Sequence, residues 1–123
     1  MKNILVVDDE EPIRNLTKRL LESGGYQVIL AADGSEALEY MKQNQGIDLV
    51  VSDVLMPEMN GVEMYQGIQD VYQERSLPVP PVIFTTGNAG GLDSEIQELS
   101  EGRVLQKPYR GSTLLELISR VLE

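Results

Sequence analysis

Short apolar runs alternate with stretches of helical periodicity from one end of the chain to the other, and this alternation restricts the fold more than any other feature. Four runs are continuous and mostly β-branched, at residues 4–7, 28–30, 49–51 and 82–84. A weaker fifth run, Val104 and Leu105, precedes Lys107. Continuous apolarity is typical of strands covered on both faces in a parallel sheet. We therefore expect these runs to form one buried parallel sheet.

The segments between the runs have the apolar spacing of amphipathic helices. The first segment, with Pro12 suited to its first turn and Gly24 and Gly25 at its end, has one apolar face: Ile13, Leu16, Thr17, Leu20 and Leu21. Four more helices are predicted from similar sets: Ala37, Leu38 and Met41, capped by Ser35; Met64, Tyr65, Ile68, Val71 and Tyr72; Leu92, Ile96 and Leu99, ended by Gly102; and Leu114, Leu117, Ile118, Val121 and Leu122. Five strand-then-helix units predict an α/β fold, a doubly wound five-stranded parallel sheet with five helices.

Length and composition narrow the possible functions. The 123 residues fit one domain, which we expect to cover residues 1–123. Cysteine and histidine are both absent, which excludes a disulfide framework, a thiol nucleophile, a Cys/His zinc site and a histidine base. Any metal must therefore be bound by oxygen ligands, which favours Mg²⁺, Mn²⁺ or Ca²⁺.

The charge of the chain is strongly acidic. Twenty acidic and ten basic residues give a net charge of −10. Nucleic acid and anionic membranes would be repelled by most of such a surface, so we expect neither as a direct partner. The apolar runs are much shorter than a membrane span, and the first of them does not have the pattern of a signal peptide, so we expect a cytoplasmic protein.

Polar residues follow the predicted strands at the points where the strands end. Asp8 and Asp9 follow the first strand, Asp53 the third, Thr86 the fourth and Lys107 the fifth. Because sites in open α/β sheets lie beyond the carboxyl ends of the strands, we expect these side chains to converge. At about 4 Å, two carboxylates repel each other by roughly 4 kcal/mol at an effective dielectric near 20, which one lysine cannot offset. A Mg²⁺ ion can, since it prefers one or two carboxylates together with water and phosphate oxygens.

The residues after Asp53 distinguish it from the other acids. Val54, Leu55, Met56 and Pro57 predict a tight turn that leaves the Asp53 side chain exposed at the end of its strand. A carboxylate can attack phosphorus to give an acyl phosphate. Phosphoryl transfer then requires in-line positioning and charge neutralisation. We expect each phosphoryl oxygen to have its own partner: Mg²⁺ for the first, Lys107 for the second, and the Thr86 hydroxyl together with the Gly87 N–H for the third.

In this order, five motifs resemble the receiver domain of bacterial two-component response regulators, the CheY-like family. The resemblance covers nearly the whole chain: LVVDDE, DGSEAL, DLVVSDVLMPEMNG, PVIFTTG and QKP. It implies phosphorylation of Asp53 by a sensor histidine kinase or a phosphotransfer protein. It also implies a Mg²⁺ site made by Asp8, Asp9, Asp53 and the backbone carbonyl of Leu55.

Further roles follow from the same resemblance. Thr86 matches the switch hydroxyl, and Lys107 matches the phosphate-binding lysine, with a cis bond to Pro108. Phosphorylation is expected to draw Thr86 inward and to reshape residues 87–91 and the fourth helix. Leu55 and Asn88 are expected to flank the path of hydrolytic water. Ile13 and the loop at Pro108 and Tyr109 are expected to dock the phosphodonor, with Leu16 and Leu20 in the core.

The sequence departs from the family pattern at two places. Val104 occupies the position where the family usually has Tyr or Phe, so the aromatic half of the switch is missing. The proline-rich residues 76–81 lengthen the connection before the fourth strand, and we expect a surface insertion away from the site.

Three alternatives remain open from the sequence. A flavodoxin-like FMN protein shares the fold, but the acids after the first strand would repel the FMN phosphate. A Mg²⁺-dependent phosphatase or phosphotransferase usually has a second aspartate two residues after its nucleophile, where this chain has Leu55. A degenerate receiver would act as an interaction module without phosphorylation, and Val104 keeps this reading open. The downstream effector is not identified by the sequence.

Overall fold

The protein forms one parallel sheet with helices on both faces. The computed structural model describes residues 1–87 and 94–123. Its strands are β1 (Asn3–Val7), β2 (Gln27–Ala31), β3 (Leu49–Asp53), β4 (Val82–Thr86) and β5 (Val104–Gln106). They lie in the order β2-β1-β3-β4-β5, and every neighbouring pair is parallel. The predicted α/β fold class is confirmed.

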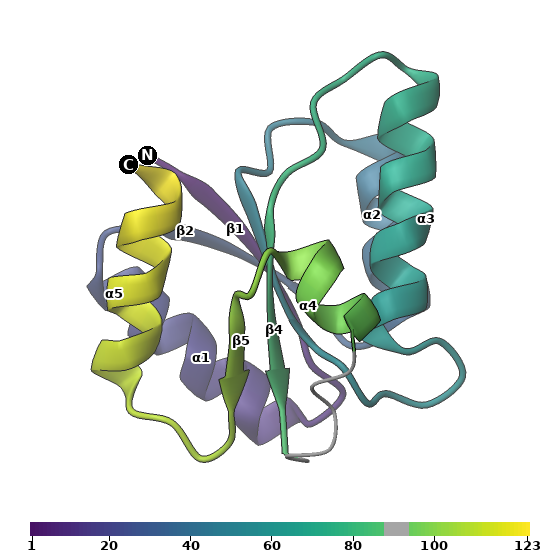
Figure 1. Cartoon of the computed structure of the whole chain (residues 1–123). Coiled ribbons are helices and arrows are strands. Elements are labelled where there is room, and N and C mark those ends of the chain that lie inside the picture. Colours follow the sequence, from purple (N-terminus) through teal and green to yellow (C-terminus); the bar gives the residue numbers. More distant parts are fainter. Residues whose placement is uncertain (88–93) are drawn as a thin grey trace.

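The helices form two layers around this sheet (Figure 1). They are α1 (Glu11–Ser23), α2 (Gly34–Gln43), α3 (Gly61–Glu74), α4 (Ser94–Ser100) and α5 (Gly111–Leu122). Helices α1 and α5 cover one face, where Leu21, Leu114 and Ile118 pack with Ile4, Val6, Leu49, Val51 and Ile83. Helices α2, α3 and α4 cover the other face, where a larger cluster surrounds Leu5, Val50 and Phe84. No helix in the described ranges is long and apolar enough to cross a membrane.

Burial follows the position of each strand in the sheet. Strands β3 and β4 are buried along their whole length, and β1 is buried except at Asn3. The prediction of two covered faces is wrong for β2, where Val28, Ile29 and Leu30 are only half-buried. Strand β2 lies at an edge of the sheet, so it has a neighbouring strand on one side only. Continuous apolarity therefore predicted the strand correctly and overstated its burial.

Two details of the predicted helices are wrong. Asp33, not Ser35, caps α2: its carboxylate accepts the Glu36 N–H at 2.7 Å, and Ser35 already lies inside the first turn. Leu16 on α1 is 61% exposed instead of lying in the core. It lies on the outer side of α1, beside an open groove, whereas Thr17 and Leu21 of the same helix are buried. The prediction at Leu92 lies outside the described residues.

The proline-rich connection before β4 is more than a surface insertion. Residues 76–81 lie at the amino end of β4, away from the carboxyl ends of the strands, as predicted. Leu77 and Val79, however, pack against the larger core cluster. The Tyr65 hydroxyl donates a hydrogen bond to the carbonyl of buried Pro80 at 2.7 Å. These contacts anchor the segment to α3.

Gly61 at the start of α3 allows a close approach to the end of β3. A Cβ atom at this position would clash with the backbone carbonyl of Asp53 and lie 3.2 Å from the Ser52 Oγ. The Gly61 N–H also donates to the carbonyl of Val54 at 2.8 Å. A side chain here would therefore displace the backbone that carries Asp53.

We expect Gly61→Ala to lower the free energy of unfolding by about 2 kcal/mol, because backbone atoms must move to accommodate the methyl group. Gly67→Ala in the same helix is the matched control, since the three atoms nearest to its Cβ would all belong to the flexible side chain of Leu38. Urea unfolding followed by circular dichroism measures both variants. Equal stability of the two variants would contradict this account of Gly61.

Candidate functional site

The loop after β1 fixes Asp8 through both its backbone and its carboxylate. The Asp8 N–H donates to the Ala31 carbonyl at 3.3 Å. Its Oδ1 accepts the Glu10 N–H at 2.9 Å, a turn in which an aspartate bonds its own backbone two residues on. Asp8 is buried, whereas the neighbouring Asp9 is exposed. One carboxylate of the pair is thus rigidly held and the other faces solvent.

Asp53 is the last residue of β3, and the prediction of an exposed side chain there is wrong. Only 7% of the residue is exposed. Strand β3 is the central strand, and its pairing with β4 continues past Asp53, because the Val54 N–H donates to the Thr85 carbonyl at 3.0 Å. Val54 and Met56 are buried in this turn, whereas Leu55 is 62% exposed.

Three carboxylates meet at the carboxyl end of the sheet, as predicted. One carboxylate oxygen from each of Asp8, Asp9 and Asp53 lies within 4.8 Å of the others. The Nζ atom of Lys107, which directly follows β5, lies 3.1 Å from Oδ2 of Asp53 and 3.7 Å from Oδ2 of Asp8. Lys107 therefore joins two of the three acids, and one positive charge faces three negative charges.

Burial and charge set the protonation behaviour of this cluster. Burial raises the pKa of Asp53, the Lys107 ammonium lowers it, and the charges of Asp8 and Asp9 raise it again, so that the net shift is upward. Burial lowers the pKa of Lys107, but the hydrogen bond and charge of Asp53 outweigh this effect and the net shift is also upward. Lys107 thus stays protonated, and the charged form of the Asp53 carboxylate costs folding stability.

The donor atoms suit a hard divalent cation. Carboxylate oxygens from three residues converge within 4.8 Å, and this set matches the preference of Mg²⁺ for oxygen ligands in an open site completed by water. A dication would also remove the repulsion that Lys107 alone leaves uncompensated. The backbone of Leu55 follows Asp53 in the same turn. The residues present therefore fit a Mg²⁺ ion.

The end of β4 brings the predicted switch residues next to this cluster. Asp53 is paired with Thr85 in the sheet register, and Thr86 follows it. Both threonines are buried, and Gly87 is exposed, with open space where a Cβ atom would lie. The Lys107 N–H donates to the Thr86 carbonyl at 2.7 Å, and the Lys107-Pro108 bond is cis, as predicted. Asn88 and the loop after it lie outside the described residues.

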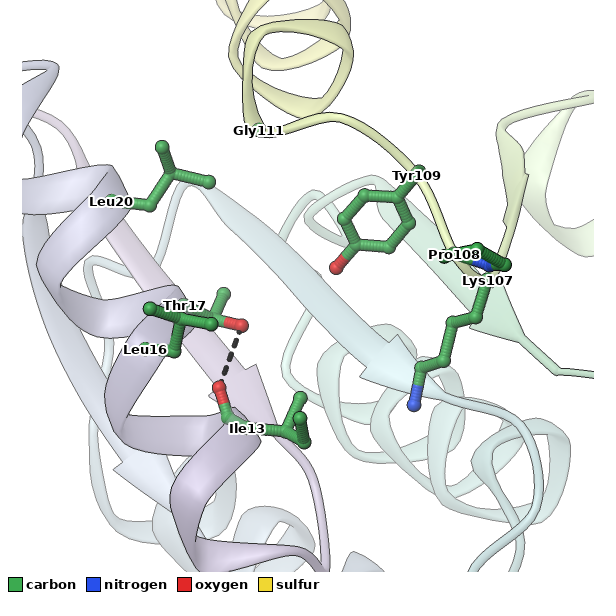
Figure 2. A pocket seen from close by; sticks show the side chains of 8 residues that line it. All are labelled: Ile13, Leu16, Thr17, Leu20, Lys107, Pro108, Tyr109 and Gly111. Atoms are coloured by element: carbon green, nitrogen blue, oxygen red, sulfur yellow. Dashed lines mark hydrogen bonds between the residues drawn. The ribbon is translucent and has the colours of Figure 1, made fainter.

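An open apolar groove of about 510 Å³ lies between α1 and the loop that connects β5 to α5 (Figure 2). Its lining contains both predicted docking elements: Ile13, Leu16, Thr17, Leu20, Lys107, Pro108, Tyr109 and Gly111. The Tyr109 ring extends over the groove (Figure 2). Lys107 lines the same groove, and its Nζ lies 3.1 Å from Oδ2 of Asp53. The groove therefore borders the carboxylate site through Lys107.

One contact of the site was not predicted. The Arg14 guanidinium Nη1 on α1 donates to the backbone carbonyl of Asp8 at 2.9 Å. No sequence motif signals such a contact, because its acceptor is a main-chain atom, and every residue but proline has the same main-chain groups. The sequence shows only that Arg14 lies a few residues after the acidic pair, and this spacing alone does not indicate a contact.

Comparison with known proteins agrees with the fold and the cluster. The family model for the response regulator receiver domain matches residues 4–119. The transcriptional regulatory protein CpxR of Escherichia coli is 35% identical over 123 residues, covering 99% of this chain and 50% of CpxR. The sensor kinase/phosphatase CqsS of Vibrio cholerae is 36% identical over 119 residues, covering 96% of this chain and 17% of CqsS. The chain thus spans half or less of the length of these relatives.

Among solved structures, the response regulator TrrA of Thermotoga maritima, in complex with Mg²⁺ and BeF, superimposes with a TM-score of 0.85. It is 30% identical, and the match covers 99% of this chain and 100% of TrrA. A receiver domain protein from Clostridium thermocellum gives a TM-score of 0.84 at 32% identity, with 99% and 94% of the two chains covered.

The chain belongs to the response regulator receiver domain family of two-component systems. Its cluster of Asp8, Asp9 and Asp53 fits the phosphoacceptor site of such a domain.

The raised pKa of Asp53 has a consequence for stability. The folded chain favours the protonated form of Asp53, so its charge lowers the free energy of unfolding at neutral pH. This cost disappears as the pH falls through the folded-state pKa. We expect Asp53→Asn to raise the free energy of unfolding by about 1 kcal/mol at neutral pH without Mg²⁺, with a smaller gain at acidic pH.

Asp70→Asn, at an exposed position on α3, is the control and should change stability by less than about 0.5 kcal/mol. Urea unfolding of the three proteins between neutral and acidic pH measures the effect. An Asp53→Asn protein less stable than the wild type at neutral pH would contradict the assigned cost.

Proposed function

We propose that Asp53 is the phosphoacceptor of this receiver domain and that phosphorylation requires Mg²⁺ held by Asp8, Asp9, Asp53 and the Leu55 carbonyl. The observation that carries the proposal is the convergence of three carboxylates within 4.8 Å, with the ammonium of Lys107 3.1 Å from Asp53. A structural ion pair needs one acid for one lysine. The excess of negative charge is useful where a cation and a phosphoryl group must be bound together.

In the reaction, an Asp53 carboxylate oxygen attacks the phosphorus of the donor. The bond between phosphorus and the leaving group breaks, and its electron pair stays on the leaving group. The product is an acyl phosphate on Asp53. Mg²⁺, when bound, neutralises carboxylate and phosphoryl charge. Lys107 gives up its hydrogen bond to the Asp53 carboxylate and donates to a phosphoryl oxygen instead. The Thr86 hydroxyl and the Gly87 N–H donate hydrogen bonds to another phosphoryl oxygen.

The response to phosphorylation begins at Thr86. Movement of this buried side chain toward the phosphoryl group changes the end of β4, from which the chain continues toward α4. The β5 position where the family usually has an aromatic residue is Val104, which is half-buried and packs against the larger core cluster. An aliphatic side chain has no ring that can turn inward, so we do not expect β5 to transmit the change as an aromatic residue would.

A sensor histidine kinase or a phosphotransfer protein supplies the phosphoryl group. The groove between α1 and the β5–α5 loop supports docking beside the site, because it is apolar and reaches Lys107 (Figure 2). Exposed Leu16 adds to half-buried Ile13 as a contact residue. The downstream effector is a protein or a domain, since the net charge of −10 disfavours nucleic acid.

The domain acts on itself and does not turn over external substrates. Leu55 lies where a phosphatase that uses an aspartyl intermediate would carry its general acid, and it is apolar. The acids after β1 oppose an FMN phosphate at the position where the flavodoxin-like alternative needs one. A phosphorylation-independent interaction module is the second candidate, and it is favoured by Val104 alone.

Phosphorylation by a small donor separates these two functions. We expect incubation with Mg²⁺ and acetyl phosphate to add one phosphoryl group per chain, because the carboxylate cluster supplies both the nucleophile and the metal site. Intact mass spectrometry measures the addition. Asp53→Asn should abolish it, and Asp70→Asn should not change it. An unmodified wild-type chain would contradict the phosphoacceptor role and leave the interaction module.

The exposed side chain of Leu55 is expected to limit access of water to the acyl phosphate. Leu55→Asn replaces an apolar cover with a group that can orient water, and we expect dephosphorylation to be roughly tenfold faster, which corresponds to about 1.4 kcal/mol in the barrier. Leu55→Met, which keeps an apolar side chain of similar volume, should have the wild-type rate. Loss of the added mass with time measures each rate, and equal rates for all three proteins would refute this role.

A further inference from the structure

We propose that Arg14 is a positioning residue for the metal site: its hydrogen bond to the Asp8 carbonyl holds the Asp8–Asp9 peptide in the orientation that brings Asp9 to Asp53. The inference rests on the proposed function, because it concerns the affinity of the same carboxylate cluster for Mg²⁺. It adds to that cluster a residue of α1 that is not itself a ligand.

The contact of Arg14 is specific. Its Nη1 donates to the Asp8 carbonyl oxygen at 2.9 Å, and the side chain is half-buried. Its backbone is also fixed, because the Arg14 N–H donates to the Glu10 carbonyl at 2.9 Å in the first turn of α1. Across the described residues, Arg14 forms no ion pair with a carboxylate. The guanidinium therefore contacts the main chain instead of neutralising an acid.

The acceptor atom explains why this contact matters for Asp9. The carbonyl of Asp8 and the N–H of Asp9 belong to one planar peptide, so fixing the oxygen fixes the plane from which the Asp9 Cα continues. Three other contacts restrain Asp8. Its N–H donates to the Ala31 carbonyl, its Oδ1 accepts the Glu10 N–H, and its Oδ2 lies near the Nζ atom of Lys107. Asp9 is exposed, and no hydrogen bond or ion pair of its side chain is found in the part of the chain that the structure describes.

The charge of Arg14 and its hydrogen bond to the Asp8 carbonyl predict opposite effects on the affinity for Mg²⁺. A positive charge near a cation site weakens cation binding, so removal of the guanidinium charge alone would tighten binding of Mg²⁺. Loss of a restraint on the ligand loop would weaken it, since partners that orient metal ligands typically contribute 10- to 100-fold in affinity, and we expect roughly the lower value here. The sign of the change therefore distinguishes a positioning role from a purely electrostatic one.

The test measures Mg²⁺ affinity directly, by isothermal titration calorimetry on the unphosphorylated chain. We expect Arg14→Gln to weaken Mg²⁺ binding roughly tenfold and Arg14→Lys, which can still donate to the carbonyl, to restore part of the loss. Arg19→Gln is the matched control: it removes the same charge from an exposed position further along α1 and should leave the affinity unchanged or slightly tighter.

A second readout separates positioning from general destabilisation. Urea unfolding without Mg²⁺ should give similar free energies for the wild type and for Arg14→Lys, while the amide NMR signals of Asp9 and Glu10 shift in Arg14→Gln. If Arg14→Gln does not fold, the comparison of Arg14→Lys with the wild type takes its place. Affinity that is unchanged or tighter in the Arg14 variants would overturn the inference and leave the proposed function intact. A wild-type chain that binds no Mg²⁺ would overturn both.

Discussion

Repulsion among three carboxylates at one end of the sheet is the interaction on which the function of this protein depends. Two of them, Asp8 and Asp53, are buried, and Lys107 supplies one positive charge between them. The fold must therefore stabilise a site that is not neutral by itself. Hydrophobic packing on both faces of the sheet provides that stability, and the site gains a strong preference for ligands that bring positive charge.

The parallel sheet determines where this repulsion occurs. All five strands point the same way, so the last residue of β3 and the residues that follow β1 and β5 meet at the carboxyl end of the sheet. Gly61 lets the start of α3 approach the Asp53 carbonyl, and the loop after β1 holds Asp8 through its own backbone. Segments distant in sequence are thereby fixed to within hydrogen-bonding distance, as the 3.1 Å contact between Lys107 and Asp53 illustrates.

Much of this arrangement could be predicted from the sequence. Continuous apolar runs identified the strands, helical spacing identified the helices, and together they predicted which acids would converge. The predicted exposure of Asp53 and the predicted burial of Leu16 were wrong. Exposure depends on how neighbouring loops and helices lie, whereas periodicity describes a single element. The cap at Asp33 was missed because Asp33 and Ser35 are both good capping residues. The contact of Arg14 with a main-chain carbonyl has no signature in sequence at all.

The dependence of folding stability on Mg²⁺ tests most directly whether this cluster is a metal site. A ligand that binds only the folded chain stabilises it by about 2.7 kcal/mol at a hundredfold excess over its Kd. The measurement is urea unfolding in MgCl₂ against NaCl of equal ionic strength. We expect the free energy of unfolding of the wild type to rise with Mg²⁺ concentration. Identical unfolding curves in the two salts, at every concentration up to the millimolar range, would contradict it.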